Sequence, residues 1–149
     1  MKYRTTNELE NFDFAESVMQ DIQLAHGFYL ILDNVKIKPE NSCNRDIRMM
    51  RCNQLHLHLE NPTELKVIEE GNKIYNANGE LQKQEEDRLV DKEEYQEVFE
   101  GLLGCTVYHI VRRDKTYELI LEGDEHSYCV TIQGESNWQE WDRFLNLGW

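Results

Sequence analysis

Hydrophobic and polar residues alternate strictly in residues 55–60 (LHLHLE). Alternation with a period of two is typical of a strand that has one buried and one exposed face. The pattern therefore predicts a strand whose three leucines face the interior, while His56 and His58 face solvent. Asn61-Pro62 ends this strand with residues that favour turns.

Three later segments alternate in the same way and are separated by short polar turns. They predict a three-strand meander over Cys105–Arg112, Thr116–Glu122 and Ser127–Gln133. Phe28–Lys38 is rich in β-branched and aromatic residues and predicts another strand.

Turn residues divide the middle of the chain. Leu65–Glu69 and Lys73–Tyr75 flank Gly71-Asn72, which predicts a short hairpin around these two residues. Residues 76–79 (NANG) predict a further turn, because Asn-Gly tolerates the positive φ angles of tight turns.

Helical spacing is clearest after Asp91. Asp91 and Glu94 have the spacing of a capping box, and Gly104 supplies an end to the helix. The apolar positions between them share one helix face: Tyr95, Val98, Phe99 and Leu102. A second short helix is predicted over residues 136–145, where Ser136 or Asn137 provides the cap. Trp138, Trp141 and Leu145 fall on one face of that helix.

Residues 12–26 admit two interpretations. Asp13 with Glu16 resembles a helix start, the apolar spacing from Phe14 is helical, and Gly27 supplies a stop, so a helix over 14–26 is favoured. The alternative is a strand, because several apolar residues here occupy even-numbered positions.

These elements predict an α+β fold in one compact domain spanning residues 1–149. The expected architecture is an antiparallel or mixed sheet of about six or seven strands, with two to three amphipathic helices packed on one side.

Charge and composition then limit the function classes. The chain carries 16 Lys+Arg against 29 Asp+Glu, a net charge of −13, and its pI is about 4.7. This argues against nucleic acid and anionic membranes as partners. The longest apolar run, residues 28–32, is far shorter than the roughly 20 residues of a membrane-spanning helix. A cytoplasmic protein is expected, with no signal peptide and with four reduced cysteines: Cys43, Cys52, Cys105 and Cys129.

Acidic residues are concentrated between Glu80 and Glu100, where nine acids face three basic residues. Such a segment is either a hydrated surface that aids solubility or a docking surface that steers a basic protein partner. Tryptophan is frequent at interfaces, and Trp149 at the end of the chain is the tryptophan expected to be exposed. The candidate partner-binding residues are Glu85, Glu86, Asp87, Asp91, Glu93, Glu94, Glu97, Glu100 and Trp149.

Two histidines offer a candidate metal site. His56 and His58 would lie on one strand face roughly 7 Å apart, close enough to share an ion, and Glu60 continues that face. The pair, followed by Glu64 and Gly71, resembles the first motif of the cupins, which implies a metal-dependent small-molecule enzyme. The cupin second motif, with Pro-x-Gly before a histidine, is absent from the sequence.

Other catalytic patterns are weak. Ser136 lacks the Gly-x-Ser-x-Gly context of a nucleophile, and phosphate-binding glycine loops are absent from the sequence. Cys105 and His109 share strand parity, which would place them on one face as a cysteine–histidine pair.

Three functions remain open, and no cofactor is expected for the favoured one. The favoured hypothesis is a non-catalytic protein that neutralises a basic partner. In size, charge and lack of catalytic motifs the chain resembles the small immunity proteins of bacterial toxin systems. The alternatives are a metal-dependent enzyme or metal-binding module that uses His56, His58 and Glu60, and an accessory subunit that makes contact through a sheet edge or Trp149.

Overall fold

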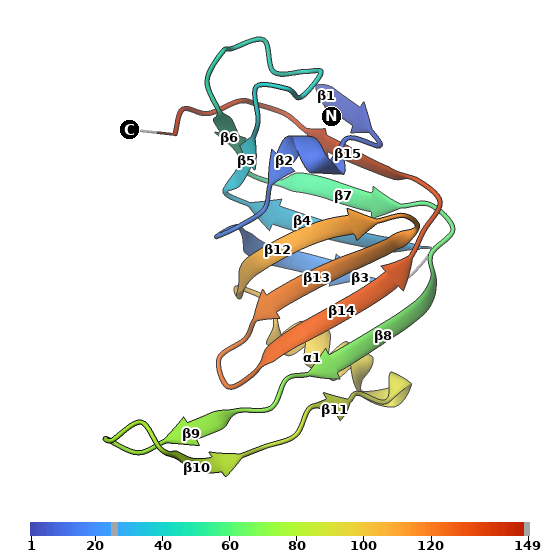
Figure 1. The fold of residues 1–149 in the computed structure, drawn as a ribbon. Helices are drawn as coiled ribbons and strands as arrows, with labels where there is room; N and C mark the ends of the chain where they lie inside the picture. The colour runs from blue at the N-terminus through green and yellow to red at the C-terminus, as the bar shows by residue number, and fades with distance from the viewer. Residues whose placement is uncertain (25–26, 148–149) are drawn as a thin grey trace.

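A large antiparallel sheet dominates the computed structural model, which describes residues 1–24 and 27–147 (Figure 1). Over these residues the main sheet has ten strands, in the spatial order β1 (Tyr3–Thr6), β15 (Asn137–Trp141), β7 (Leu55–Leu59), β4 (Phe28–Asp33), β3 (Val18–Gln23), β12 (Thr106–Arg113), β13 (Thr116–Glu122), β14 (Ser127–Gln133), β8 (Thr63–Glu69) and β11 (Arg88–Leu89). A small sheet contains β2 (Phe12–Asp13), β5 (Val35–Ile37) and β6 (Met50–Cys52).

The remaining elements are short. β9 (Lys73–Tyr75) and β10 (Leu81–Gln84) pair with each other in a separate hairpin. The helical segments are η1 (Leu9–Asn11), η2 (Lys92–Glu94) and α1 (Tyr95–Gly101). In the described part of the chain, none of these helices has the length and apolar character needed to cross a membrane.

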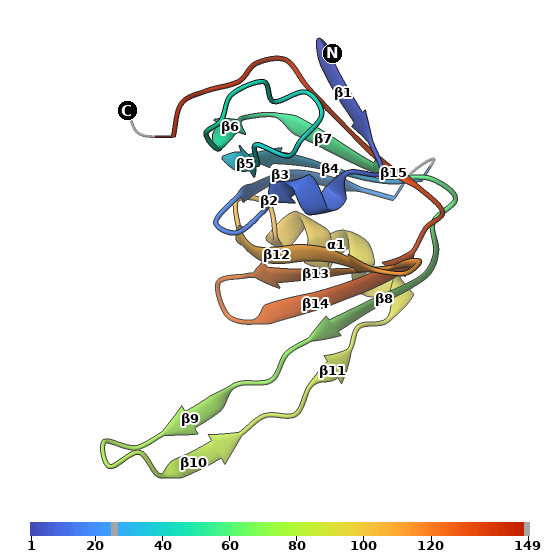
Figure 2. The ribbon, with the colours of Figure 1, turned by 45° about the horizontal axis from the view of Figure 1, so that its top comes forward.

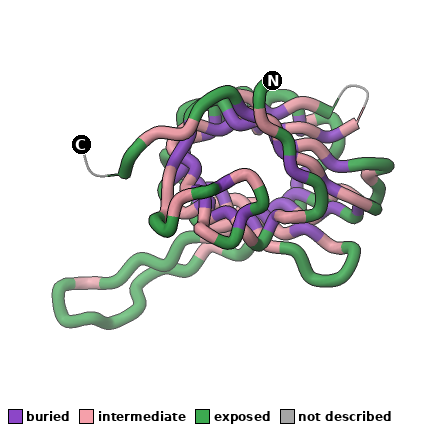
Figure 3. The backbone as a smooth tube through the Cα atoms, turned by 90° about the horizontal axis from the view of Figure 1, so that it is seen from above, coloured by how far each residue is buried: buried purple, intermediate pink, exposed green. Residues whose placement is uncertain are grey.

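The main sheet curls strongly, so that its buried positions face a common interior (Figures 2 and 3). The right-handed twist of adjacent strands favours such curling in a large sheet. Leu30, Leu57, Val107, Leu119 and Val130 are at most 3% exposed and fill this interior from five different strands. Tyr95, Phe99 and Leu102, from α1 and the residue after it, join the same core.

The predicted α+β class is wrong. The structure has 50% of its residues in strands and 9% in helices, with a single helical stretch of 10 residues formed by η2 and α1. The sheet is correspondingly larger than predicted, because two segments assigned to helices are strands.

The first of these segments is residues 14–26, which contains β3 in place of a helix. A register shift between Met19 and Asp21 marks a bulge in the β3–β4 ladder. The extra residue places both Met19 and Ile22 on the buried face, although they are three positions apart.

The helix was favoured on its start and stop signals, Asp13 with Glu16 and Gly27. In the structure Asp13 Oδ1 accepts a hydrogen bond from the Ala15 amide (3.0 Å) in a turn before β3, so the apparent start signal belongs to a turn. Residues 25 and 26 of the predicted helix lie outside the described residues.

The second segment is residues 136–145, where β15 replaces the predicted helix. Asn137, Gln139 and Trp141 are fully buried and alternate with half-buried Trp138 and Glu140. Two of the three inward positions carry amides, so the alternation is hidden from a hydrophobicity pattern. Trp138 and Trp141 consequently lie on opposite faces of the sheet.

Hydrogen bonds satisfy these buried amides and cross the interior of the sheet. The Thr5 hydroxyl donates to Gln139 Oε1 (2.7 Å), and Gln139 Nε2 donates to Asn137 Oδ1 (2.6 Å). Asn137 Nδ2 donates to the hydroxyl of Tyr117 on β13 (2.9 Å). Because β15 and β13 are not neighbours in the sheet, this chain of hydrogen bonds connects its two halves.

The other predicted elements fare unevenly. The strand over 55–59, the meander β12–β14 and the capped helix after Asp91 are confirmed. The hairpin around Gly71-Asn72 is wrong, because β8 pairs with β14 and β11 while β9 pairs with β10. The turn at residues 76–79 is confirmed and connects β9 to β10.

Candidate partner-binding surface

The acidic segment predicted from the sequence, residues 80–100, runs from the residue before β10 through β11 to α1. Asp91 and Glu94 form the capping box that starts the helical stretch, and Tyr95 and Phe99 anchor it in the core. Burial of one face leaves the opposite face of η2 and α1 to the acids. Glu93, Glu97 and Glu100 follow one another at intervals of four and three residues, so they share this exposed face.

The eight candidate partner-binding acids of this segment divide into two groups. Four are engaged within the protein, by an ion pair with Lys83 (3.7 Å), a hydrogen bond from the Gly71 amide (2.8 Å), the helix cap and an ion pair with Arg88 (3.0 Å) in turn: Glu85, Asp87, Asp91 and Glu94. The others take part in no ion pair within the described residues and are exposed: Glu86, Glu93, Glu97 and Glu100. The carboxylates of the second group are the ones that remain available to basic side chains of another protein.

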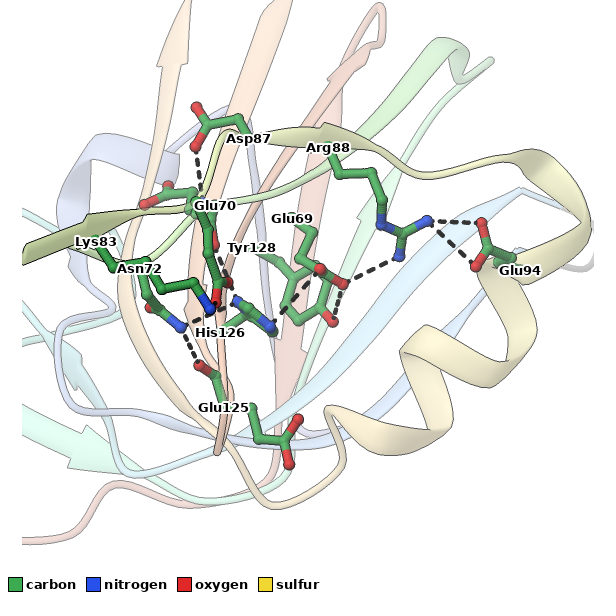
Figure 4. Close-up of polar contacts among 12 residues, drawn as sticks. Glu69, Glu70, Asn72, Lys83, Asp87, Arg88, Glu94, Glu125, His126 and Tyr128 are labelled. Atoms are coloured by element: carbon green, nitrogen blue, oxygen red, sulfur yellow. Dashed lines mark hydrogen bonds and ion pairs between the residues drawn. The ribbon is translucent and has the colours of Figure 1, made fainter. Parts of the chain in front are cut away.

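Arg88, exposed on β11, joins the sheet to η2 at the start of the helical stretch (Figure 4). Its guanidinium contacts Glu69 Oε2 at 3.1 Å and Glu94 Oε2 at 3.0 Å. The hydrogen bond from Arg88 lowers the pKa of Glu69, with a further contribution from the Tyr128 hydroxyl, which donates to Glu69 at 3.0 Å. Burial and this same hydrogen bond raise the pKa of Tyr128. Glu69 therefore stays ionised and Tyr128 protonated, an arrangement that fixes geometry and is ill suited to proton transfer.

His126 and Asn72 complete this polar cluster (Figure 4). His126 Nδ1 lies 3.1 Å from the Glu70 carbonyl oxygen, and its Nε2 lies 3.7 Å from Glu69 Oε1. Asn72 Nδ2 donates to the carbonyl of Glu125 in the turn between β13 and β14 (3.2 Å). These contacts connect the residues that precede β9 to the body of the protein.

The hairpin β9–β10 projects away from the body, and we call residues 72–85 the arm (Figures 1 and 2). Every residue of β9 and β10 is exposed. Three large apolar side chains on these strands are about half exposed: Ile74 (48%), Tyr75 (55%) and Leu81 (49%). Tyr75 and Leu81 are direct cross-strand partners and so share one face of the arm.

Three clefts border the helical stretch of η2 and α1 within the described residues. One, of about 460 Å³, lies beside the Arg88 cluster and is lined by Glu97, Asp124 and Glu125 among others. A second, of about 540 Å³, is lined by residues of β3 and α1, and a third, of about 670 Å³, has a partly apolar lining that includes Tyr95. The 460 Å³ cleft extends the negative surface around the helix.

The two histidines of the candidate metal site lie on the outward face of β7, as predicted, and both are half-buried there. There His58 stacks between Trp138, whose ring centroid is 4.8 Å away, and Tyr29, at 5.4 Å. Glu60 is engaged by the Ser136 hydroxyl. The described residues contain no group of three or more His, Cys, Asp or Glu side chains placed to hold a metal ion. The histidine pair thus forms part of an aromatic ladder across the sheet.

The proposed cysteine–histidine pair is not formed. A register shift between Val107 and His109 in β12 breaks the parity on which it depended. Cys105 packs against the core, whereas His109 turns outward and contacts Glu118 Oε2 at 3.0 Å. Burial raises the pKa of Cys105 to about 11, which also disfavours a thiolate nucleophile.

The acidic segment was predicted from the sequence, but the arm was not. The signal was present: Asn78-Gly79 lies between Lys73–Tyr75 and Leu81–Gln84, two short segments that each contain apolar residues. Centring the hairpin on Gly71-Asn72 instead concealed it. Trp149, the remaining candidate, lies outside the described residues.

Comparisons of the chain with protein-family models, with curated proteins and with solved structures found no match.

Proposed function

We propose that this protein is a non-catalytic binding protein that docks on a basic protein, as an inhibitor or immunity-type protein does. The observation that carries the proposal is the exposed row Glu93, Glu97 and Glu100 on one face of η2 and α1. No ion pair within the described residues neutralises these carboxylates. Together with the net charge of −13, they attract a positively charged surface and accelerate its association.

The support comes from the arrangement as well as from the charge. The carboxylates stand on a helix that is capped by Asp91 and anchored by Tyr95 and Phe99, so they are held in fixed positions before a partner arrives. A preorganised surface loses less conformational entropy on binding than a flexible acidic loop does. The residues with perturbed proton affinity near it, Glu69 and Tyr128, are engaged in structural contacts.

The test is reversal of the three helix charges in the full chain, Glu93→Lys with Glu97→Lys and Glu100→Lys. Glu94 is left intact because it caps the helix and binds Arg88. The control variant has the same change in net charge and reverses three exposed acids elsewhere: Glu10, Glu40 and Asp114.

Each tagged variant is expressed in the native cells and its captured proteins are identified by mass spectrometry. We expect wild type and the control to retain one protein of high pI, and the helix variant to lose it. With that protein purified, affinity should fall steeply between 50 and 200 mM salt, as expected for association driven by charge. Equal binding by the helix variant and wild type would remove the acidic surface from the proposal.

A further inference from the structure

The arm exposes apolar side chains that the rest of the molecule leaves uncovered. Ile74, Tyr75 and Leu81 are each about half exposed on a hairpin whose strands, among the described residues, pair only with each other. An isolated two-stranded hairpin is at best marginally stable in water, and it gains stability when a face is covered. Apolar residues gathered on a projecting element are typical of a surface that binds another molecule.

The structure also holds the arm in a defined direction. At its base, the Glu85 amide donates to the Asn72 carbonyl (2.8 Å) and the Gly71 amide donates to Asp87 Oδ1 (2.8 Å). The backbones approach so closely there that a Cβ on Gly71 would lie 1.8 Å from the Glu85 carbonyl oxygen. Only glycine permits this approach.

The far end of the arm is equally ordered by hydrogen bonds. Asn76 Oδ1 accepts from the amides of Asn78 (2.9 Å) and Glu80 (3.0 Å), and Gly79 adopts a positive φ of 81°. Because the arm is held at both ends, Tyr75 and Leu81 are already in position, and less conformational entropy is lost when a partner binds them.

The charges on the arm and at its base indicate the chemistry of the surface that the arm would bind. Residues 72–85 carry two basic side chains, Lys73 and Lys83, and two acidic ones, Glu80 and Glu85, so the net charge of the arm is zero. Acids that Arg88 does not pair with gather at its base instead: Glu70, Glu85, Glu86, Asp87, Asp124 and Glu125. A complementary surface on a partner is therefore apolar where it contacts the arm and basic where it faces the acids at the base of the arm. Lysines on both strands also discourage simple strand-to-strand pairing with other chains.

We propose that the arm inserts into an apolar cleft of the same basic protein that the acidic helix face attracts, with Tyr75 and Leu81 as its anchors. This inference rests on the proposed function and assigns a second, apolar contact to the partner. A second copy of this chain fits less well, because two chains of net charge −13 repel each other.

The experiment places the photo-crosslinker p-benzoylphenylalanine at one position at a time in the full chain, expressed in the native cells. Tyr75 probes the arm, and Gln96, exposed on α1, probes the acidic helix. Tyr108 is the matched control, since its side chain is 59% exposed against 55% for Tyr75 but lies on β12. Adducts are identified by mass spectrometry.

We expect the Tyr75 and Gln96 positions to capture the same protein of high pI, and the Tyr108 position to capture none of it. Capture from Gln96 without capture from Tyr75 overturns the arm inference and leaves the proposed function standing. Failure at both positions counts against both proposals. An adduct between two copies of this chain at Tyr75, or an acidic or neutral protein there, also overturns the inference.

Affinity gives an independent measure once the basic protein is purified. The double variant Tyr75→Ser with Leu81→Ser should bind at least about tenfold more weakly, as expected when interface anchors are truncated. Tyr108→Ser should bind within about twofold of wild type. Equal affinities for the two variants would show that the arm contributes no contact.

Discussion

Replacement of Tyr117 by phenylalanine tests whether the hydrogen bonds that cross the sheet interior stabilise the fold. The substitution removes one hydroxyl and leaves the ring in place, so little volume is lost. Asn137 Nδ2 then retains only Asn7 Oδ1, at 3.5 Å, in a site where Asn137 is fully buried. A buried polar group left without a good partner costs about 1–3 kcal/mol of unfolding free energy.

For a domain of this size each kcal/mol corresponds to roughly 2–4 °C in Tm, so Tyr117→Phe should lower Tm by about 2–12 °C. Thermal unfolding followed by circular dichroism, with urea unfolding in parallel, measures the loss. Tyr108→Phe is the control, because that tyrosine is 59% exposed. Removal of its hydroxyl should change the free energy of unfolding by less than about 0.5 kcal/mol. Equal Tm values for the two variants would show that the hydrogen bond to Tyr117 adds nothing to stability.

Three further predictions concern the arm, a cysteine and a histidine. Gly71→Ala forces the Glu85 carbonyl away and should accelerate hydrogen exchange at the Glu85 amide, whereas Gly101→Ala, with open space around it, should not; unchanged exchange in both would contradict the close approach. Burial raises the pKa of Cys52 to about 12, so a thiol reagent at pH 8 should modify Cys52 only after unfolding; rapid modification of the native protein would show that it is accessible. Burial lowers the pKa of His58 below 6.5, so the unfolded chain binds its proton first and stability should fall as pH drops from 6.5 towards that lowered pKa. His58→Gln should flatten this part of the stability profile, and an unaltered slope would assign the pH dependence to other groups.

The sequence predicted the elements in which apolar residues hold the buried positions at a regular spacing. The alternation of residues 55–60 and of the meander survives in the structure because leucine, isoleucine and valine occupy the inward positions. The capped helix after Asp91 was also predicted, because its capping box and its apolar residues indicate the same helix.

The elements that were missed fail for two physical reasons. A bulge in β3 shifts the strand parity between Met19 and Ile22, and nothing in a periodicity of two or 3.6 anticipates it. In β15 the inward residues Asn137 and Gln139 are polar, and their burial depends on partners 20 or more residues distant in the chain, Tyr117 and Thr5. Long-range hydrogen bonding of this kind leaves no local signal.

The candidate surface was predicted in part. The acidic segment was located from charge alone, because a concentration of Asp and Glu residues can be read directly from the sequence. Which carboxylates are free depends on the position of Arg88, whose two contacts remove Glu69 and Glu94 from the surface available to a partner. The arm depends on strand pairing across the turn at residues 76–79, which only the three-dimensional ladder establishes.

The close approach of Gly71 and Glu85 marks the base of the arm. Beyond that junction no residue of β9 or β10 is buried, so substitutions there leave the interior of the protein untouched. The length and side chains of the hairpin can therefore change without disturbing the core. Under the role proposed for the arm, such a change would alter the target that the protein binds while the rest of the fold stays the same.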